Sequence, residues 1–248
     1  MTALWALTLR ELRAFWYSPI AYAVGALFLL LQGLVFWLLV LALGQAWSDP
    51  SFTVAQAFLG PTFFSATSML VMVPLLTMRT FSEEKRTGSI ELLLSAPVTD
   101  AQVVGSKFLG AWLAYILLWL ATLPFFVLLR TFGGFYWGPV LTGYLGTWLL
   151  GGVLVALGVF ASSLTRNQVI AAVISGVAML LLFSVGLLDI FIKDPETSKI
   201  IRYLSLFEHL RDFSKGLLDT RPIVFYGSLM AMCVFLTGRV IGSPRWRS

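Results

Sequence analysis

The segment IAYAVGALFLLLQGLVFWLLVLAL, residues 20–43, contains no charged side chain and a single amide, Gln32. About 20 apolar residues are enough for a helix to cross the hydrocarbon core of a bilayer. The chain as a whole is 58% hydrophobic and only 12% charged. A soluble domain carries about 25% charged residues, because much of its surface must face water. The sequence therefore predicts an integral membrane protein of the all-α class.

Six segments of this kind follow one another along the chain. We predict transmembrane helices over residues 20–43, 58–78, 108–129, 139–164, 168–188 and 223–241. Pro61 and Pro74 interrupt the second span, and Pro124 lies near the end of the third. Proline and glycine are tolerated in membrane helices when neighbouring groups satisfy the freed backbone. The expected fold is a polytopic bundle with six transmembrane helices.

The N-terminal residues 1–19 have a different pattern. Leucine and tryptophan side chains cover a broad helical face, whereas Arg10, Glu11 and Arg13 cluster elsewhere. Such a pattern is typical of a helix that lies in the membrane interface. The alternative is an N-terminal extension of the first span.

Charge in the loops indicates the orientation. With six spans the two termini share one side, and that side holds ten of the 17 basic residues: Arg10, Arg13, Arg79, Lys85, Arg86, Lys107, Arg166, Arg239, Arg245 and Arg247. Short cytoplasmic loops carry an excess of Lys and Arg. We therefore expect both termini in the cytoplasm, although six basic residues in the last outer loop count against this orientation.

A charged loop, residues 79–107, separates the second span from the third. Thr80 with Glu83 and Thr99 with Gln102 both have the spacing of a capping box, which predicts two helix starts. The first helix would present a charged edge to the cytosol, formed by Glu83, Glu84, Lys85, Arg86 and Glu91. Charge of both signs favours a protein partner over nucleic acid, which requires a basic surface. The alternative is that the loop only stops membrane insertion.

The outer segment, residues 189–221, contains an amphipathic pattern. Apolar residues recur every three or four positions from residue 198 to 217 and include Phe207 and Phe213, which predicts a helix. His209, the only histidine, lies on it and is expected to be exposed. The helix would either gate the outer mouth of a pathway or cap the bundle at the lipid interface.

Few polar groups lie within the spans. Gln32 in the first span and Asp189 at the end of the fifth are the candidates for a transport pathway. Five glycines of the fourth span are expected to allow close helix packing: Gly143, Gly146, Gly151, Gly152 and Gly158. A pathway without charge favours a lipid, a polymer or another amphipathic cargo, or a mechanical role, over ion transport.

The sequence fits two other classes of function less well. A membrane-embedded enzyme needs paired His, Asp or Glu within its spans, and one histidine with Asp189 does not supply them. The single cysteine, Cys233, allows neither an internal disulfide nor a cysteine-based metal site. An ion-coupled carrier or channel without an ATPase partner would show internal repeats or charged, broken helices. A non-catalytic chain with no bound cofactor or metal is the expectation, and the carrier remains the alternative.

The loop also resembles a known family. RTFSEEKRTGSIELLLSAPV, residues 79–98, and TDAQVVGSKF, residues 99–108, are similar to the cytoplasmic loop of type-two ATP-binding-cassette (ABC) transporter permeases. The similarity is greatest to the subfamily of gliding-motility-associated and nitrous-oxide-reductase-maturation permeases. It extends to RELRAFWYSPIAY, residues 10–22, and FSKGLLDTR, residues 213–221.

The resemblance implies a single permease domain over residues 1–248, with an interfacial N-terminal helix, a coupling helix in the loop and amphipathic outer helices between the fifth and sixth spans. It also implies a separate ABC ATPase as partner. The residues expected to couple to the ATPase are Glu83, Glu84, Lys85, Arg86, Gly88, Glu91 and Leu92. The chain has no GxxxxGK[ST] phosphate-binding loop, so ATP and Mg would be bound by the partner. Two ATPase copies, a second permease chain that is the same or related, surrounding membrane lipid, export and a bacterial inner membrane are also implied.

Overall fold

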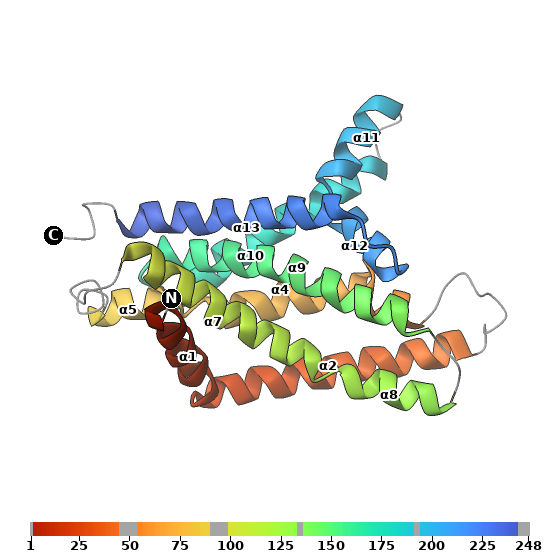
Figure 1. Ribbon diagram of the computed structural model, residues 1–248, viewed down its shortest axis with the longest axis horizontal. Coiled ribbons are helices and arrows are strands. Elements are labelled where there is room, and N and C mark those ends of the chain that lie inside the picture. Colours follow the sequence, from red (N-terminus) through yellow and green to blue (C-terminus); the bar gives the residue numbers. More distant parts are fainter. Residues whose placement is uncertain (1, 45–53, 90–98, 133–135, 191–193, 243–248) are drawn as a thin grey trace.

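The computed structural model describes residues 2–44, 54–89, 99–132, 136–190 and 194–242, and within these ranges every regular element is a helix. Long helices run side by side and form one elongated bundle (Figure 1). Glu91 and Leu92 of the predicted coupling helix lie outside the described residues. The all-α prediction is confirmed.

The helices follow one another in chain order. They are α1 Thr2–Trp16, α2 Pro19–Gly44, α3 Val54–Leu59, α4 Phe63–Thr77, α5 Ser82–Thr87, α7 Asp100–Leu120, α8 Leu123–Phe132, α9 Trp137–Ser163, α10 Gln168–Leu187, the 3-10 turn η1 Leu188–Ile190, α11 Pro195–Leu204, α12 Leu206–Ser214 and α13 Thr220–Ile241.

Within the described ranges, six helical segments are long and apolar enough to cross a membrane. They are Ala21–Ala42, Val54–Thr87, Asp100–Thr131, Trp137–Ser163, Gln168–Gly186 and Thr220–Ile241. Each corresponds to one predicted span, so the prediction of six spans is confirmed. The second and third segments are longer than predicted and broken, the second at Gly60 and Pro61 between α3 and α4, and the third at Thr122 between α7 and α8.

Helix α9 forms the centre of the bundle. It contacts α3, α4, α7, α10, α12 and α13, and the seven consecutive residues 150–156 are all buried. Its glycines explain how so many helices approach it. A Cβ added at Gly151 would collide with the Tyr115 ring, and one added at Gly146 would lie 2.6 Å from Phe213 Cβ. All five glycines named above have such a neighbour, so the prediction of close packing is confirmed.

The two ends of the bundle carry different elements (Figure 1). Helices α1 and α5 and the last turn of α13 lie at one end, which we call the α5 end. Helices α8, α11 and α12 lie at the other, which we call the α11 end. This arrangement brings the first and last described helices to the same end, as an even number of spans requires.

Helix α1 is separate from the first span. The chain turns at Tyr17 and Ser18, and α1 then lies across the α5 end and packs on α7. Gly110 of α7 allows this approach, because a Cβ there would lie 2.8 Å from Glu11 Cβ. Residues 2–16 therefore do not form an N-terminal extension of the first span, which was the alternative. The interfacial role of α1 stays a prediction.

The periodicity of residues 198–217 predicts a single outer helix, whereas the family resemblance implies more than one, and the structure has more than one. The outer segment consists of two helices, α11 and α12, that break at Ser205, the residue that ends one and begins the other. Helix α11 projects away from the bundle, whereas α12 packs on α9 (Figure 1). His209 was expected to be exposed but is buried, because its Nε2 atom lies 2.9 Å from the Tyr203 carbonyl and its ring packs on Phe225.

Candidate functional site

The start of α5 is held by a residue from another helix. No side chain of its own segment caps it, so the predicted Thr80–Glu83 capping box is wrong. Instead the backbone N–H groups of Phe81 and Ser82 both donate to Ser162 Oγ of α9, each at 3.1 Å. Ser162 in turn donates to the Met78 carbonyl at 3.1 Å. Orphan backbone donors at a helix N-terminus need such a partner, and here it fixes α5 to the central helix.

Two further side chains of α5 reach the helices below it. The buried Lys85 ammonium donates to the Ser163 carbonyl, near the C-terminal end of α9. A cation is favourable there, because the unsatisfied carbonyls of a helix C-terminus carry partial negative charge. Glu83 accepts a hydrogen bond from Gln168 Nε2 at the start of α10, at 3.0 Å. Helix α5 is therefore attached to both α9 and α10.

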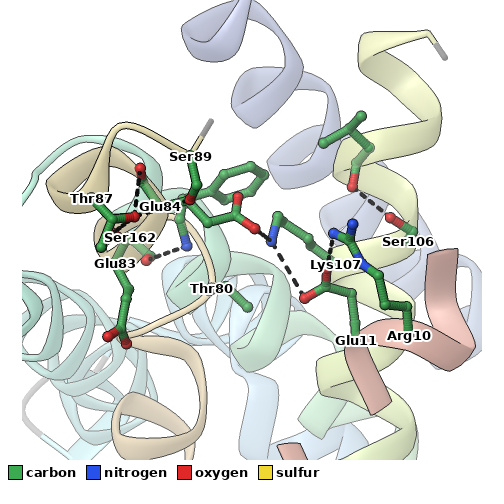
Figure 2. Close-up of polar contacts among 12 residues, drawn as sticks. Arg10, Glu11, Thr80, Glu83, Glu84, Thr87, Ser89, Ser106, Lys107 and Ser162 are labelled. Carbon is green, nitrogen blue, oxygen red and sulfur yellow. Dashed lines mark hydrogen bonds and ion pairs between the residues drawn. The ribbon is translucent and has the colours of Figure 1, made fainter. Parts of the chain in front are cut away.

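Glu84 joins α5 to two more helices through a lysine (Figure 2). Lys107 Nζ of α7 lies 2.7 Å from Glu84 Oε1 and 3.3 Å from Glu11 Oε2 of α1. The Lys107 side chain is only 2% exposed, and its ammonium also lies 5.3 Å from the centre of the buried Phe81 ring. Arg10 extends the network by pairing with Glu11 at 2.8 Å.

This network is costly to disrupt. Transfer of an ammonium group out of water carries a large desolvation penalty, which only its two carboxylate partners offset. Removal of one partner of a buried pair costs about 3–5 kcal/mol, because the other charge is left without compensation. The network of Glu11, Glu84 and Lys107, which we call the Lys107 hub, therefore holds α1, α5 and α7 in one arrangement.

The rest of α5 faces solvent. Residues 86–89 are all exposed, and the Arg86 side chain, 63% exposed, makes only a 3.6 Å contact with Glu83. Gly88 ends the helix in the left-handed conformation, with φ of +75°, which glycine adopts without strain. The exposed edge is narrower than the sequence indicated, because Glu84 and Lys85 are turned toward the bundle.

The other predicted site residues lie elsewhere. Gln32 is buried in α2, with its amide nitrogen 3.5 Å from Ser68 Oγ of α4. Asp189 lies in η1 and pairs with Arg202 of α11 at 2.9 Å. The Arg202 contact and a hydrogen bond from the Ser198 hydroxyl, which is the larger cause, hold the pKa of the Asp189 carboxyl below its usual range. The structure does not bring Gln32 and Asp189 together in one described cavity.

Three predicted site residues remain, Arg13 of the N-terminal helix and Phe207 and Phe213 of the outer segment. Arg13 of α1 is exposed, whereas Phe213 of α12 is fully buried against α9. Phe207 stacks on Phe183 of α10, with ring centres 4.6 Å apart. The outer helix is thus attached to α9 and α10 through its aromatic residues.

Two residues of the site were not identified from the sequence. Lys107 was placed at the end of the loop, and Ser162 was one of several small residues in the fourth span. No local pattern marks either residue, because the partners of Lys107 are 96 and 23 positions away in the chain and Phe81, a partner of Ser162, is 81 positions away. The sequence contains one indication of the hub. Lys107 is a basic residue at the edge of an apolar span, and the loop before it contains the acidic Glu84.

At the α5 end of the bundle, one face of the short helix α5 is bonded to other helices, and the opposite face is exposed. Residues 54–236, more than half of the chain, match the model of the family described as ABC-2 family transporter protein. No curated protein sequence matches the chain. The family is that of the membrane component of ABC transporters, which implies an ABC ATPase as partner. The chain, a multi-pass membrane protein with six apolar helical segments, therefore belongs to the ABC-2 transporter family.

Proposed function

We propose that this chain is the permease subunit of an ABC exporter and that α5 transmits the movement of a separate ATPase to the membrane helices. ATP and Mg are bound by that partner, at the α5 end, which faces the cytoplasm of a bacterial cell. Both termini are then cytoplasmic, in the inner membrane. Residues 1–248 act as one permease domain, with 79–107 as the coupling loop.

The observation that carries this proposal is the contrast between the two faces of α5. Its inner face contacts three other helices, α7, α9 and α10, through Glu83, Glu84 and Lys85 and through the Ser162 cap. Its outer face, residues 86–89, makes only local contacts among the described residues. A helix that is bonded inward and free outward can bind a partner and pass its displacement to the bundle.

The contacts define where such a displacement would go. A push on α5 acts on α9 through Ser162 and Ser163, and on α10 through Gln168. It acts on α7 and α1 through the Lys107 hub. Packed helices respond to a local shift by rigid-body rotation or sliding. ATP-driven closure of the ATPase would therefore rock these four helices together.

The working unit we propose contains two ATPase copies and a second permease chain, the same as this one or related to it. The resemblance of residues 79–108 to type-two permeases supports this assembly and export as the direction. Apart from Lys85 and Lys107, the buried polar side chains of the described spans are neutral, as Gln32, Ser68 and Thr147 are. A lipid, a polymer or another amphipathic molecule fits such a pathway better than an ion does.

Copurification with an ATPase assay tests the proposal. The tagged chain is isolated from its native membrane in mild detergent, and the associated proteins and their ATPase activity are measured. Arg86→Glu, on the outer face of α5, should reduce recovery of the ATPase. Glu84→Gln, on the inner face, should retain the ATPase but lose its stimulation by the permease, because α5 is no longer held to α7.

Arg239→Glu is the matched control, since Arg239 is also exposed at the α5 end but lies on α13. It should leave both recovery and stimulation unchanged. Recovery of a folded chain with no ATPase would instead support an ion-coupled carrier. Full stimulation in a well-folded Glu84→Gln variant would contradict the coupling role of α5.

A further inference from the structure

A cavity of about 320 Å³ opens beside the Lys107 hub, between α1, α2, α4 and α7. Its polar rim is formed by Arg79, Lys107 and the three carboxylates of Glu11, Glu83 and Glu84. Its deeper walls are apolar. Phe15 of α1, Ala21 and Val24 of α2, Leu75 of α4 and Ala114 of α7 contribute to them. The cavity is thus polar on one side and apolar on the other.

The apolar side continues toward the middle of the bundle. Val24 and Leu75 also line a second, shallow groove between α2 and α4. Its other walls include Leu27, Leu31 and Val71, which are 47%, 39% and 45% exposed. The groove contains one hydroxyl, that of Ser68. The polar cavity lies at one end of α2 and α4, and the apolar groove runs along the same two helices. Together they match the polar head and the apolar tail of an amphiphile.

Two polar atoms at the rim are unsatisfied. Arg79 Nε and Glu84 Oε2 are buried and have no hydrogen-bond partner among the described residues. The nearest carboxylate to Arg79, that of Glu83, is 3.9 Å away, which is too long for a hydrogen bond. The other oxygen of Glu84 is used by Lys107. Buried polar groups without partners are rare in native proteins, so one donor and one acceptor at the same cavity indicate a ligand that supplies both.

The charges of the rim restrict that ligand. An anionic head group alone would be placed beside three carboxylates, and a cationic one alone beside Arg79 and the buried Lys107. A head group with both a phosphate and an ammonium satisfies both unsatisfied atoms. Guanidinium groups bind phosphate through charge-assisted hydrogen bonds, and a carboxylate accepts hydrogen bonds from a primary ammonium.

We propose that this cavity binds the head group of a zwitterionic aminophospholipid. Its phosphate lies on Arg79, its ammonium on Glu84, and one acyl chain in the groove between α2 and α4. Helix α1 covers the head group, because Glu11, Ala14 and Phe15 line the cavity from that side. The site places a membrane lipid in contact with the Lys107 hub and does not depend on the ATPase.

Native mass spectrometry of the purified full chain tests the site. The protein in detergent is titrated with phosphatidylethanolamine, phosphatidylcholine and phosphatidylglycerol of identical acyl chains, and the fraction that retains a lipid is measured. We expect phosphatidylethanolamine to be retained at about tenfold lower concentration than phosphatidylglycerol. Phosphatidylcholine should be retained less well than phosphatidylethanolamine, because its quaternary ammonium has no N–H to donate to Glu84.

Two variants remove the site in different ways. Arg79→Gln removes the phosphate partner and should raise the lipid concentration that is required by about tenfold. Ala14→Phe keeps every charge and fills the cavity from the exposed side of α1, so it should give a similar loss even if Arg79→Gln folds poorly.

Arg239→Gln, the same arginine substitution outside the cavity, should retain the lipid as the wild type does. Equal retention of phosphatidylglycerol and phosphatidylethanolamine, or unchanged retention in both cavity variants, would overturn the proposal.

Discussion

Charge is used in opposite ways at the two ends of this bundle. At the α5 end, one buried lysine joins three helices that are far apart in the sequence, at 2.7 and 3.3 Å from its two carboxylates. At the α11 end, the ion pairs of the described residues are local and exposed, apart from that of Asp189 in η1 with Arg202 in α11. Lys199 with Glu196 and Arg211 with Glu208 are each three residues apart on a single helix. Only the first arrangement joins three helices that are far apart in the sequence.

Neutral hydrogen bonds fix the α11 end instead. The Thr142 hydroxyl of α9 donates to the Phe213 carbonyl at 2.7 Å, and the Tyr226 hydroxyl of α13 donates to the Leu206 carbonyl at 2.7 Å. Both bonds reach α12 from a spanning helix and are buried. Helix α12 is thus held by its backbone and by its apolar face rather than by its charges.

The difference bears on how the molecule would move. A buried ion network depends on every partner being in place, so a displacement of α5 changes the environment of Lys107 at once. A neutral, closely packed end resists displacement and keeps its shape. We infer that the α5 end responds to a partner and that the α11 end serves as the fixed base against which the spans turn.

Loss of the buried lysine should have the largest effect. Lys107→Met leaves Glu11 and Glu84 without a cation, and the free energy of unfolding should fall by about 3 kcal/mol. The low end of the usual range applies because the carboxylates are 19% and 22% exposed and can be hydrated. Denaturant unfolding in mixed micelles, followed by circular dichroism, measures this change.

The same substitution at the other end is its control. Lys199→Met removes a pair whose side chains are 73% and 80% exposed, and it should cost less than about 0.5 kcal/mol. Equal losses in the two variants would remove the distinction between the ends, since burial of the charge would then play no part.

Close packing at the α11 end should give the next largest effect. Gly146→Ala places a methyl group 2.6 Å from Phe213 Cβ and should destabilise the docking of α12 by about 1–3 kcal/mol. Gly138→Ala, in the same helix, meets nothing within 4 Å and should cost nothing. Faster proteolysis within α12 of the Gly146 variant alone would locate the loss. A variant with wild-type stability would show that α12 is not fixed by packing.

The sequence predicted the spans because hydropathy is a local property. Each apolar run must become a helix in lipid, whatever its neighbours are. The same holds for the start of α7, where the Thr99 and Gln102 capping box is confirmed at 3.0 and 3.3 Å. Both partners of that box lie within one turn, so the sequence contains all the information that is needed.

The candidate site could be predicted only in part, because its contacts are not local. Residues of α5 were identified, but which of them face inward was not, since this depends on Ser162 and Lys107 of other helices. The Thr80 hydroxyl donates to the carbonyl of Thr77 instead of capping α5. His209 was predicted to be exposed for the same reason, since nothing near it in sequence shows that Phe225 covers it.

The tertiary cap of α5 should give a smaller effect than either change above. Ser162→Ala removes the acceptor of two backbone N–H groups and should destabilise α5 locally by about 1 kcal/mol. Hydrogen exchange in α5 should become faster, while exchange in the rest of the bundle stays unchanged. Ser163→Ala is the neighbouring control, because among the described residues the Ser163 hydroxyl bonds only to the Phe160 carbonyl of its own helix. Unchanged exchange in the Ser162 variant would show that the side chains of Glu83, Glu84 and Lys85 are enough to hold α5.

The smallest expected effect concerns Asp189, whose pair with Arg202 links η1 to α11 at the α11 end. The Ser198 hydroxyl and Arg202 favour its ionised form and lower its pKa in the folded protein. Their contribution is therefore present above the unfolded value of about 4 and is lost as the pH falls through the folded pKa. Protection factors for hydrogen exchange in α11 should decrease over this range in the wild type.

Asp189→Asn should lack that protection already at pH 7, whereas Glu196→Gln, whose only described partner is Lys199, should titrate as the wild type does. A wild-type pH profile in the Asn variant would assign the pH dependence to Asp194 instead, because its carboxylate caps the start of α11 and hydrogen bonds from Thr197 also lower its pKa. Asp189 would then contribute nothing to the stability of α11, and the contrast with the α5 end would be greater than we expect.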